Sequence, residues 1–281
     1  MQIHVIDAGH FKLDGGAMFG VVPKTIWNKM IPADENNLCS WNLRCLLVNT
    51  GNRLILIDTG MGDKQDAKFQ GYYFRHGDGD LIKSIRNAGY SEKDVTDVIF
   101  SHLHFDHCGG GVKWNADRTG FELTFPNAKY WTHSAHWDWA MHPNAREKAT
   151  FLKENIMPIY ESGHLNFIDQ ASNEFGSDID FLYADGHTEK MIMPIINYQE
   201  KKLIFIADTI PSHAHIHVPF VMGYDVRPLQ TMTEKEMLLQ KAVTENMIVV
   251  FDHDPSHDAA TIQKTDRGFK LEHLGGLSEF L

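Results

Sequence analysis

One short motif constrains the fold of this chain more than any other feature. Residues 102–107 read His-x-His-x-Asp-His, after an apolar run rich in β-branched residues and just before three consecutive glycines. His102 and His104 stand two residues apart, so in extended backbone their side chains point to the same side and can hold one metal ion. Asp106 and His107 follow where the chain bends, so they can face a second ion. Imidazole and carboxylate ligands together suit Zn²⁺ and neighbouring divalent metals.

The same motif resembles the signature of the metallo-β-lactamase superfamily at every position. The superfamily pattern continues with a His in a Gly-His turn, an Asp that ends a strand and a His that ends a late strand. His187, Asp208 and His253 stand at these three places. Asp58, in an Asp-Thr-Gly sequence, resembles the structural turn that precedes the site in the family. The resemblance runs from about residue 40 to about residue 255 and implies an α/β fold, the four-layer αβ/βα sandwich.

The resemblance also implies how the ligands are divided between two metal ions. His102, His104 and His187 would hold one ion, Asp106, His107 and His253 would hold the other, and Asp208 would bridge the two. Five neutral imidazoles and two carboxylates leave two divalent ions strongly positive, which would lower the pKa of a bridging water toward neutrality. Asp106 is then placed to orient the resulting hydroxide and to pass a proton to the leaving group. Zinc is the expected metal, although the same ligands accept Fe²⁺ or Mn²⁺.

The chemistry expected from this site is attack of hydroxide on an ester-like bond. The spacing of His187, Asp208 and His253 resembles that of N-acyl-homoserine lactonases, which makes a small-molecule lactone the expected substrate. Those lactonases usually carry a Tyr three residues after the bridging Asp, and this chain has Pro211 there. The 80-residue interval from His107 to His187 is more similar to that of methyl-parathion-hydrolase-like enzymes. A phosphotriesterase is therefore the alternative, and other carboxylesters or thioesters are also open.

Other classes of function are less favoured by the sequence. A metal-bound sensor or binding module without catalysis is one alternative, but all seven expected ligands are intact. The net charge of −11 argues against nucleic acid and anionic membranes as partners. No run reaches the roughly 18 apolar residues of a membrane span, and the first residues show no signal-peptide pattern. Three scattered cysteines fit a reducing compartment, so a cytoplasmic location is expected. The aromatic content is compatible with a homodimer.

Short apolar runs bounded by turn residues predict β-strands along the whole chain. The runs are 3–6, 44–48, 54–57, 95–100, 128–131, 179–183, 191–196, 203–207 and 247–251. Residues 49–52 predict a hairpin turn, so the second and third strands are expected to be antiparallel. Strands interspersed with helices predict two sheets that pack face to face and are covered by helices.

Three helical segments are expected between these strands. One spans residues 80–88 and ends at a glycine. Another begins at a capping box opened by Thr233, with Met237 among its inward-facing residues. The third covers about 134–160 and belongs to a Trp- and His-rich helical insertion at about 134–175. No linker or repeat divides the sequence, so a single domain over the whole chain is expected.

Three alternating histidines follow the expected bridging ligand, at His213, His215 and His217. They could bind a metal of their own, but no adjacent Asp-His pair or glycine turn supports this interpretation. We expect them to line the substrate pocket, with His215 as the best candidate for a substrate contact.

Apolar side chains from two segments are further candidates for substrate binding. Residues 15–24 are interpreted either as a core strand or as a hydrophobic flap that pairs with residues 220–222. The candidate contacts are Phe19, Trp27, Phe220, Met222 and Tyr224. An aromatic cluster of Trp131, Trp137 and Trp139 could close the other side of the site.

Overall fold

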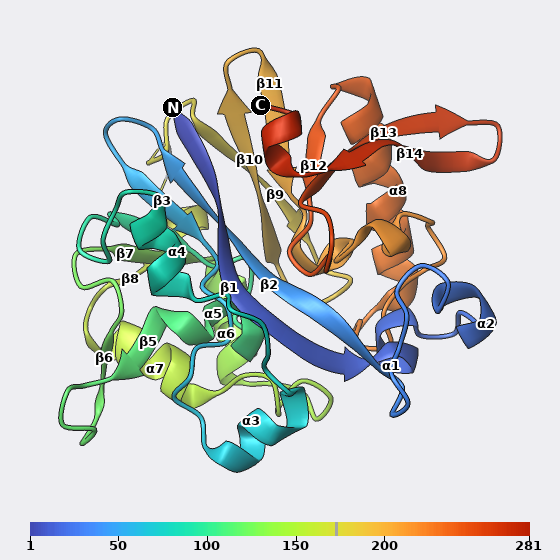
Figure 1. The fold of residues 1–281 in the computed structure, drawn as a ribbon. Coiled ribbons are helices and arrows are strands. Elements are labelled where there is room, and N and C mark those ends of the chain that lie inside the picture. The colour runs from blue at the N-terminus through green and yellow to red at the C-terminus, as the bar shows by residue number, and fades with distance from the viewer. Residues whose placement is uncertain (172–173) are drawn as a thin grey trace. The chain divides into compact units, whose positions relative to one another are not determined.

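The structure, a computed structural model, describes residues 1–171 and 174–281 (Figure 1). Contacts within the chain divide it into two compact units that interleave in sequence. The first unit comprises Met1–Gly9 and Leu43–Glu174, and the second comprises His10–Asn42 and Phe175–Leu281. The single domain expected over the whole chain stays a prediction. Among the described residues, no helix is both long and apolar enough to cross a membrane.

The sheet that carries the first unit has the strand order β1-β2-β3-β4-β7-β8. The strands are β1 (Gln2–Asp14), β2 (Leu38–Asn49), β3 (Leu54–Ile57), β4 (Asp97–Ile99), β7 (Lys129–Thr132) and β8 (Leu165–Phe167). β2 and β3 are antiparallel, whereas β3, β4, β7 and β8 run parallel to one another. Every residue of β3 and β4 is buried, as is usual for parallel strands that are covered on both faces.

Short helices and a small second sheet complete the first unit. The helices are α3 (Ala67–Tyr73), α4 (Leu81–Asn87), α5 (Phe105–Cys108), α6 (Ser134–Met141) and α7 (Lys153–Glu161), with 3-10 turns η1 (Gly109–Gly111) and η2 (Ile168–Gln170). β5 (Val112–Trp114) and β6 (Phe121–Leu123) form an antiparallel pair. α5 and η1 follow β4 directly in sequence, so the residues of the His-x-His-x-Asp-His motif lie just beyond the end of a buried strand.

The second unit is built on the sheet β14-β13-β12-β11-β10-β9. Its strands are β9 (Ile179–Ala184), β10 (Met191–Tyr198), β11 (Lys201–Phe205), β12 (Ile248–Val250), β13 (Ala259–Thr265) and β14 (Gly268–Gly275). β11 and β12 are parallel and the other neighbours are antiparallel. The helices are α1 (Gly15–Phe19), α2 (Lys24–Trp27) and the long α8 (Pro228–Thr244), with turns η3 (Ala207–Thr209), η4 (His213–His215) and η5 (Leu277–Glu279).

The predicted strands are confirmed, because each of the nine apolar runs overlaps a strand. The hairpin is confirmed as well: Thr50 N donates to Arg53 O at 3.0 Å, and β2 and β3 are antiparallel. The strands that the sequence did not predict are β5, β6, β8, β13 and β14. The first three have only three residues each, and the last two carry mixed polar and apolar side chains that are partly exposed.

The expected start of the long helix was wrong. α8 begins at Pro228, whose ring fixes φ for the first helical position and whose missing N–H costs nothing there. Thr233 therefore lies inside the helix, where its hydroxyl donates to Leu229 O at 3.3 Å. Met237, expected to face inward, is 68% exposed, whereas Leu238 is buried. By contrast, α4 starts as expected, with Asp80 accepting a hydrogen bond from Lys83 N at 2.7 Å.

The helical segment expected over about 134–160 is two helices. α6 ends at Met141 and α7 begins at Lys153. The residues between them form a loop, in which Asn144 Oδ1 accepts hydrogen bonds from the backbone N–H groups of Arg146 and Glu147. Such side-chain caps favour turns over continuous helix. Of the insertion expected at 134–175, residues 172–173 lie outside the described residues.

Of the two alternatives for residues 15–24, the core strand was wrong. These residues form α1 and begin α2, after Asp14 caps α1 by accepting from Ala17 N at 2.8 Å. The expected pairing with residues 220–222 finds support next to that segment, where Gly223 N donates to Ala17 O at 2.7 Å. Gly20, at φ +56°, packs against Val221 O so closely that a Cβ would lie 2.7 Å away.

Candidate metal centre

The first unit brings the two leading histidines of the motif together. His102 follows β4, and His104 is the residue before α5. Nε2 of His102 and Nδ1 of His104 lie 3.0 Å apart, and both side chains are buried. This is about the separation of two nitrogen ligands on one zinc ion, since each Zn–N bond is about 2.0–2.1 Å. The two rings therefore offer half of a tetrahedral site.

The remaining ring nitrogens of the motif are held by other side chains. His107 Nδ1 lies 2.9 Å from Asp58 Oδ2, and Ser101 Oγ donates to the same oxygen at 2.7 Å. His104 Nε2 lies 3.3 Å from Glu147 Oε1. Carboxylates on the outer nitrogen of an imidazole fix its tautomer and orientation, which is the usual environment of metal-binding histidines.

The glycines after the motif allow the loop at Asp58 to reach it. A Cβ on Gly109 would lie 2.0 Å from Met61 O, and one on Gly110 would lie 2.1 Å from Thr59 O. Because these positions have no side chain, Thr59 N can donate to His107 O at 2.7 Å. The Asp-Thr-Gly turn thus holds both the backbone and the ring of His107.

The second unit supplies a carboxylate between two further histidines. Asp208 Oδ2 lies 3.1 Å from His187 Nε2, and Asp208 Oδ1 lies 3.2 Å from His253 Nε2. All three side chains are buried. A carboxylate that turns one oxygen toward each of two imidazoles has the geometry of a bridging ligand.

The outer nitrogens of these two rings are also engaged. His187 Nδ1 lies 2.9 Å from Asp225 Oδ1, and His253 Nδ1 donates to Asn42 O at 2.7 Å. Burial alone would lower the pKa of His187, but Asp208 and Asp225 outweigh it and raise the pKa to about 10. A metal at His187 Nε2 would replace the proton that these carboxylates attract.

Three of these supporting residues were missed in the sequence. Glu147 lies in the loop between α6 and α7 and also accepts from Trp139 Nε1 at 2.7 Å. Asn42 acts through its backbone oxygen, which no side-chain pattern can reveal. Asp225 had only a faint signal, its place after a Gly-Tyr pair. Asp252 is a further carboxylate near the site. Its Oδ2 lies 3.8 Å from His253 Nε2, the ring nitrogen that Asp208 also approaches.

The candidate substrate contacts are mostly packed into the second unit. Phe19 lies between His215, at 4.4 Å, and Trp27, at 5.2 Å, with all three rings nearly parallel. His215 Nδ1 lies 2.8 Å from Ser212 Oγ and His215 Nε2 lies 2.9 Å from Met18 O, so both nitrogens have partners.

Four of the six candidate substrate contacts are buried, and two are accessible to solvent. Phe19, Trp27, His215 and Met222 are buried, Phe220 is half-buried and Tyr224 is 39% exposed. The buried rings attach α1 and α2 to the segment that follows Asp208. Substrate contacts at all six positions stay a prediction.

The three tryptophans expected to form one cluster have separate partners. Trp131 is buried and donates to Asp97 Oδ1 at 2.9 Å. Trp137 stacks on Tyr160 with ring centroids 5.2 Å apart. Trp139 donates to Glu147, which places it beside the support of His104.

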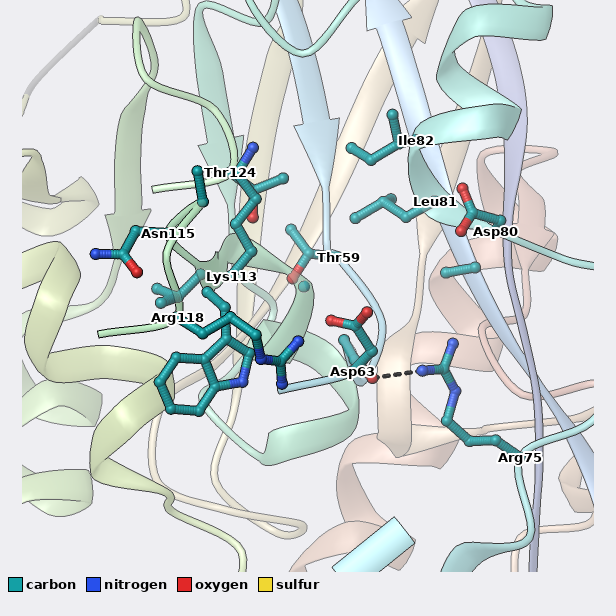
Figure 2. Close-up of a pocket in the computed structure, with 16 residues that line it drawn as sticks. Thr59, Asp63, Arg75, Asp80, Leu81, Ile82, Lys113, Asn115, Arg118 and Thr124 are labelled. Atoms are coloured by element: carbon teal, nitrogen blue, oxygen red, sulfur yellow. Dashed lines mark hydrogen bonds between the residues drawn. The ribbon is translucent and has the colours of Figure 1, made fainter. Parts of the chain in front are cut away.

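A separate cavity of about 590 Å³ lies in the first unit (Figure 2). Its charged lining residues are Asp63, Arg75, Asp80, Lys113 and Arg118, and Arg75 donates to Gly62 O at 2.6 Å. None of the seven expected metal ligands, all of which the structure describes, lines this cavity. Thr59, in the Asp-Thr-Gly turn, and Gly110, just after the motif, are among its lining residues. The cavity therefore lies next to the loops around the motif.

The family model of the metallo-beta-lactamase superfamily matches residues 44–265. The chain belongs to this superfamily. A probable metal-dependent hydrolase from Staphylococcus aureus has a similar structure, with a TM-score of 0.87 and 28% identity over 98% of this chain and 96% of that chain. The expected metallo-β-lactamase fold, of the α/β class, is therefore confirmed, and the expectation of a metal-dependent hydrolase is confirmed at the level of the superfamily.

Several relatives of this chain are named as lactonases. An N-acyl homoserine lactonase of Bacillus thuringiensis is 25% identical over 267 residues, which cover 90% of this chain and 93% of the relative. The lactonase AiiB of Agrobacterium fabrum is 20% identical over 289 residues, with 94% and 98% covered. AidC, a dizinc quorum-quenching lactonase in complex with a product, has a TM-score of 0.79 at 23% identity over 96% of this chain and 92% of that chain, a likeness that shows the fold alone.

Proposed function

We propose that the chain is a dinuclear metal hydrolase. In this proposal His102, His104 and His187 bind one ion, Asp106, His107 and His253 bind the other, and Asp208 bridges them. The observation that carries the proposal is the carboxylate of Asp208, which turns one oxygen to each of two imidazoles, at 3.1 and 3.2 Å.

The donor atoms fit divalent transition ions of the zinc type. Nε2 of His102 and Nδ1 of His104 converge within 3.0 Å, and their outer nitrogens are engaged by Ser101 and Glu147. Burial removes water from the carboxylates and from the lone pairs of the imidazole nitrogens. A cation bound between these groups would compensate for the lost hydration. Zinc is the proposed metal, because tetrahedral nitrogen and oxygen ligands suit it well.

Two ions bound in this way would supply an activated water and would polarise the oxygen of the bond to be cleaved. The side chains then have distinct tasks. Asp106, whose carboxylate is 11% exposed and lies 3.9 Å from His107 Nε2, is placed to accept a proton from the attacking water and to deliver it to the leaving oxygen. Asp58, Glu147 and Asp225 keep the imidazoles in one tautomer, so that the ligands do not rearrange during turnover.

The proposed substrate is an N-acyl-homoserine lactone, and the proposed reaction is hydrolytic opening of its ring. The support is the spacing of the ligands and the relatives that are named as lactonases. Pro211 stands where those enzymes usually have a Tyr, so another donor must assist the departing ring oxygen. Tyr224, 39% exposed and next to Asp225, is the proposed donor. A phosphotriester is the second candidate, favoured by the 80-residue interval between His107 and His187.

Acid release from a long-chain N-acyl-homoserine lactone tests this function. Zinc-loaded protein is expected to release one proton per ring opened, and metal-stripped protein and Asp208→Asn are expected to release none. Tyr224→Phe should lower kcat while zinc content stays the same. Zinc-dependent cleavage of a phosphotriester without lactone opening would show that the chain is a phosphotriesterase, the second candidate. Zinc-loaded protein that cleaves neither would contradict both proposed substrates. The cytoplasmic location and the homodimer stay predictions.

A further inference from the structure

A second group of metal-binding side chains lies within the second unit, outside the seven proposed ligands. His213 begins η4, and Asp254 and His257 lie in the loop that follows β12. One ligand atom from each of the three lies within 4.8 Å of the others. No local spacing connects the three, because His213 alternates with His215 and His217, and His257 lies 44 residues further along the chain.

Asp254 is the residue of this group whose side chain is held most firmly by hydrogen bonds. Its side chain is fully buried, and it accepts hydrogen bonds from the backbone N–H groups of His213 at 2.8 Å, Ser256 at 3.0 Å and His257 at 2.9 Å. These three backbone donors hold the carboxylate in one position before any cation arrives.

The two histidines face this carboxylate differently. His213 Nδ1 lies 2.5 Å from Asp254 Oδ2, within hydrogen-bonding distance. His257 Nδ1 lies 3.5 Å from Asp254 Oδ1, and it is buried with no hydrogen-bond partner in the part of the chain that the structure describes. A buried ring nitrogen without a partner destabilises the folded chain, because it has lost its hydrogen bonds to water. A cation between the ring and the carboxylate would satisfy it.

We propose that His213, Asp254 and His257 form a third metal site, separate from the dinuclear centre, for a divalent transition ion such as Zn²⁺. The ion would replace the proton between His213 and Asp254 and draw His257 onto the same centre. Two neutral imidazoles and one carboxylate leave a net charge of +1 with the ion bound. The side chains of His213 and His257 are 18% and 35% exposed, so water can complete a tetrahedral coordination.

Such a site would be structural. It would join η4 to the loop that begins just after His253 and would hold the segment that packs on α1 through His215. His215 is not part of it, because both of its ring nitrogens already have partners. Removing the ion should therefore loosen this connection without removing a ligand of the proposed dinuclear centre.

Metal content after dialysis against buffered micromolar free zinc tests the proposal. His257→Ala is expected to hold one zinc per chain fewer than the wild type, and His213→Ala is expected to lose the same ion. His273→Ala is the matched control, since that side chain is a histidine of the same unit and 53% exposed. It should bind as much zinc as the wild type. Equal zinc content in His257→Ala and the wild type would overturn the site.

The difference in zinc content between the wild type and His257→Ala does not depend on how many ions the proposed dinuclear centre holds. If the dinuclear proposal fails, Asp208→Asn leaves zinc content unchanged, while the effect of His257→Ala persists. Co²⁺ provides a second measurement, because each tetrahedral ion adds visible absorption. His257→Gln, which keeps a polar side chain, is to be used if the alanine variant does not fold. It should also lack one ion, and full binding by it would contradict the proposal.

Discussion

Each of the five proposed histidine ligands has one ring nitrogen that lies 2.7–3.3 Å from an oxygen of another residue. The engaging groups lie far away in sequence: Asp225 is 38 residues from His187, and the oxygen of Asn42 is 211 residues from His253. The proposed ligands could be named from the sequence, since they follow strand ends in a dense and specific pattern, and they stay a prediction. Their supports could not, because nothing in the local sequence distinguishes a carboxylate or carbonyl that will later meet an imidazole.

Asp225→Asn is expected to weaken zinc binding by roughly 10- to 100-fold. The amide can still accept a hydrogen bond from His187 Nδ1, but it lacks the charge that favours the ring as a ligand. A competition titration with a chromophoric chelator measures the dissociation constant. Asp180→Asn, which changes an exposed carboxylate of the same unit, is the control. Unchanged affinity in Asp225→Asn would mean that this pair does not orient a ligand.

Helix α8 holds the segment after η4 through one buried lysine. Lys235 Nζ donates to His217 O at 3.0 Å and to Phe220 O at 2.6 Å, and its side chain is fully buried. Burial lowers the pKa of this amine to about 7. The sequence pattern marked the apolar face of the helix but gave no sign that a lysine belongs to it, because burial of an amine depends on carbonyls from another segment.

Lys235→Met is expected to lower the free energy of unfolding by about 1–3 kcal/mol, because two carbonyl oxygens lose a charged donor. Urea denaturation measures the loss. Lys241→Met, on the same helix but with a partly exposed side chain, should cost less than about 0.5 kcal/mol. Equal effects of the two substitutions would show that the contacts of Lys235 are not what stabilises this segment.

The parallel strands of the first unit are joined at one end by Glu174. It forms ion pairs with Arg53, before β3, and with Lys129, on β7, both at 2.8 Å. Lys129 and Arg53 lower the pKa of Glu174 to about 2. A carboxyl whose pKa is lowered on folding stabilises the fold above its unfolded pKa near 4.5, and this contribution is lost as the pH falls toward 2.

Glu174→Gln should therefore lower the free energy of unfolding by about 0.5–1 kcal/mol at pH 7, and the difference from the wild type should vanish near pH 2. Urea titrations at several pH values measure the difference between the two proteins. Glu122→Gln serves as the comparison, since its partner Lys113 is 3.4 Å away and both side chains are well exposed. A difference that persists at pH 2 would exclude the ion pairs as its cause.

For the whole chain, the sequence predicted the nine strands that are apolar, the fold and the superfamily. The strands could be predicted because continuous burial leaves an apolar local sequence, and the superfamily could be predicted because its metal-ligand motif is intact. The three-residue strands β5 and β6, the start of α8 and the break between α6 and α7 depend on contacts with residues distant in sequence. In the same way, the Asp-Thr-Gly turn was predicted to lie before the site, while the close packing of Thr59 on Gly110 required the structure.

Removal of the metals should destabilise the chain as a whole. The proposed ligands are up to 151 residues apart in sequence, from His102 to His253, so the ions bind the folded chain far better than the unfolded chain. An ion present at a thousand times its dissociation constant adds about 4 kcal/mol to the stability of a folded protein. Thermal unfolding with excess zinc or with chelator measures the shift, which should be large in the wild type and much smaller in Asp208→Asn. His257→Ala should keep most of the shift, because it removes only the third site. An equal melting temperature with zinc and with chelator would mean that the ligands do not assemble into a metal centre.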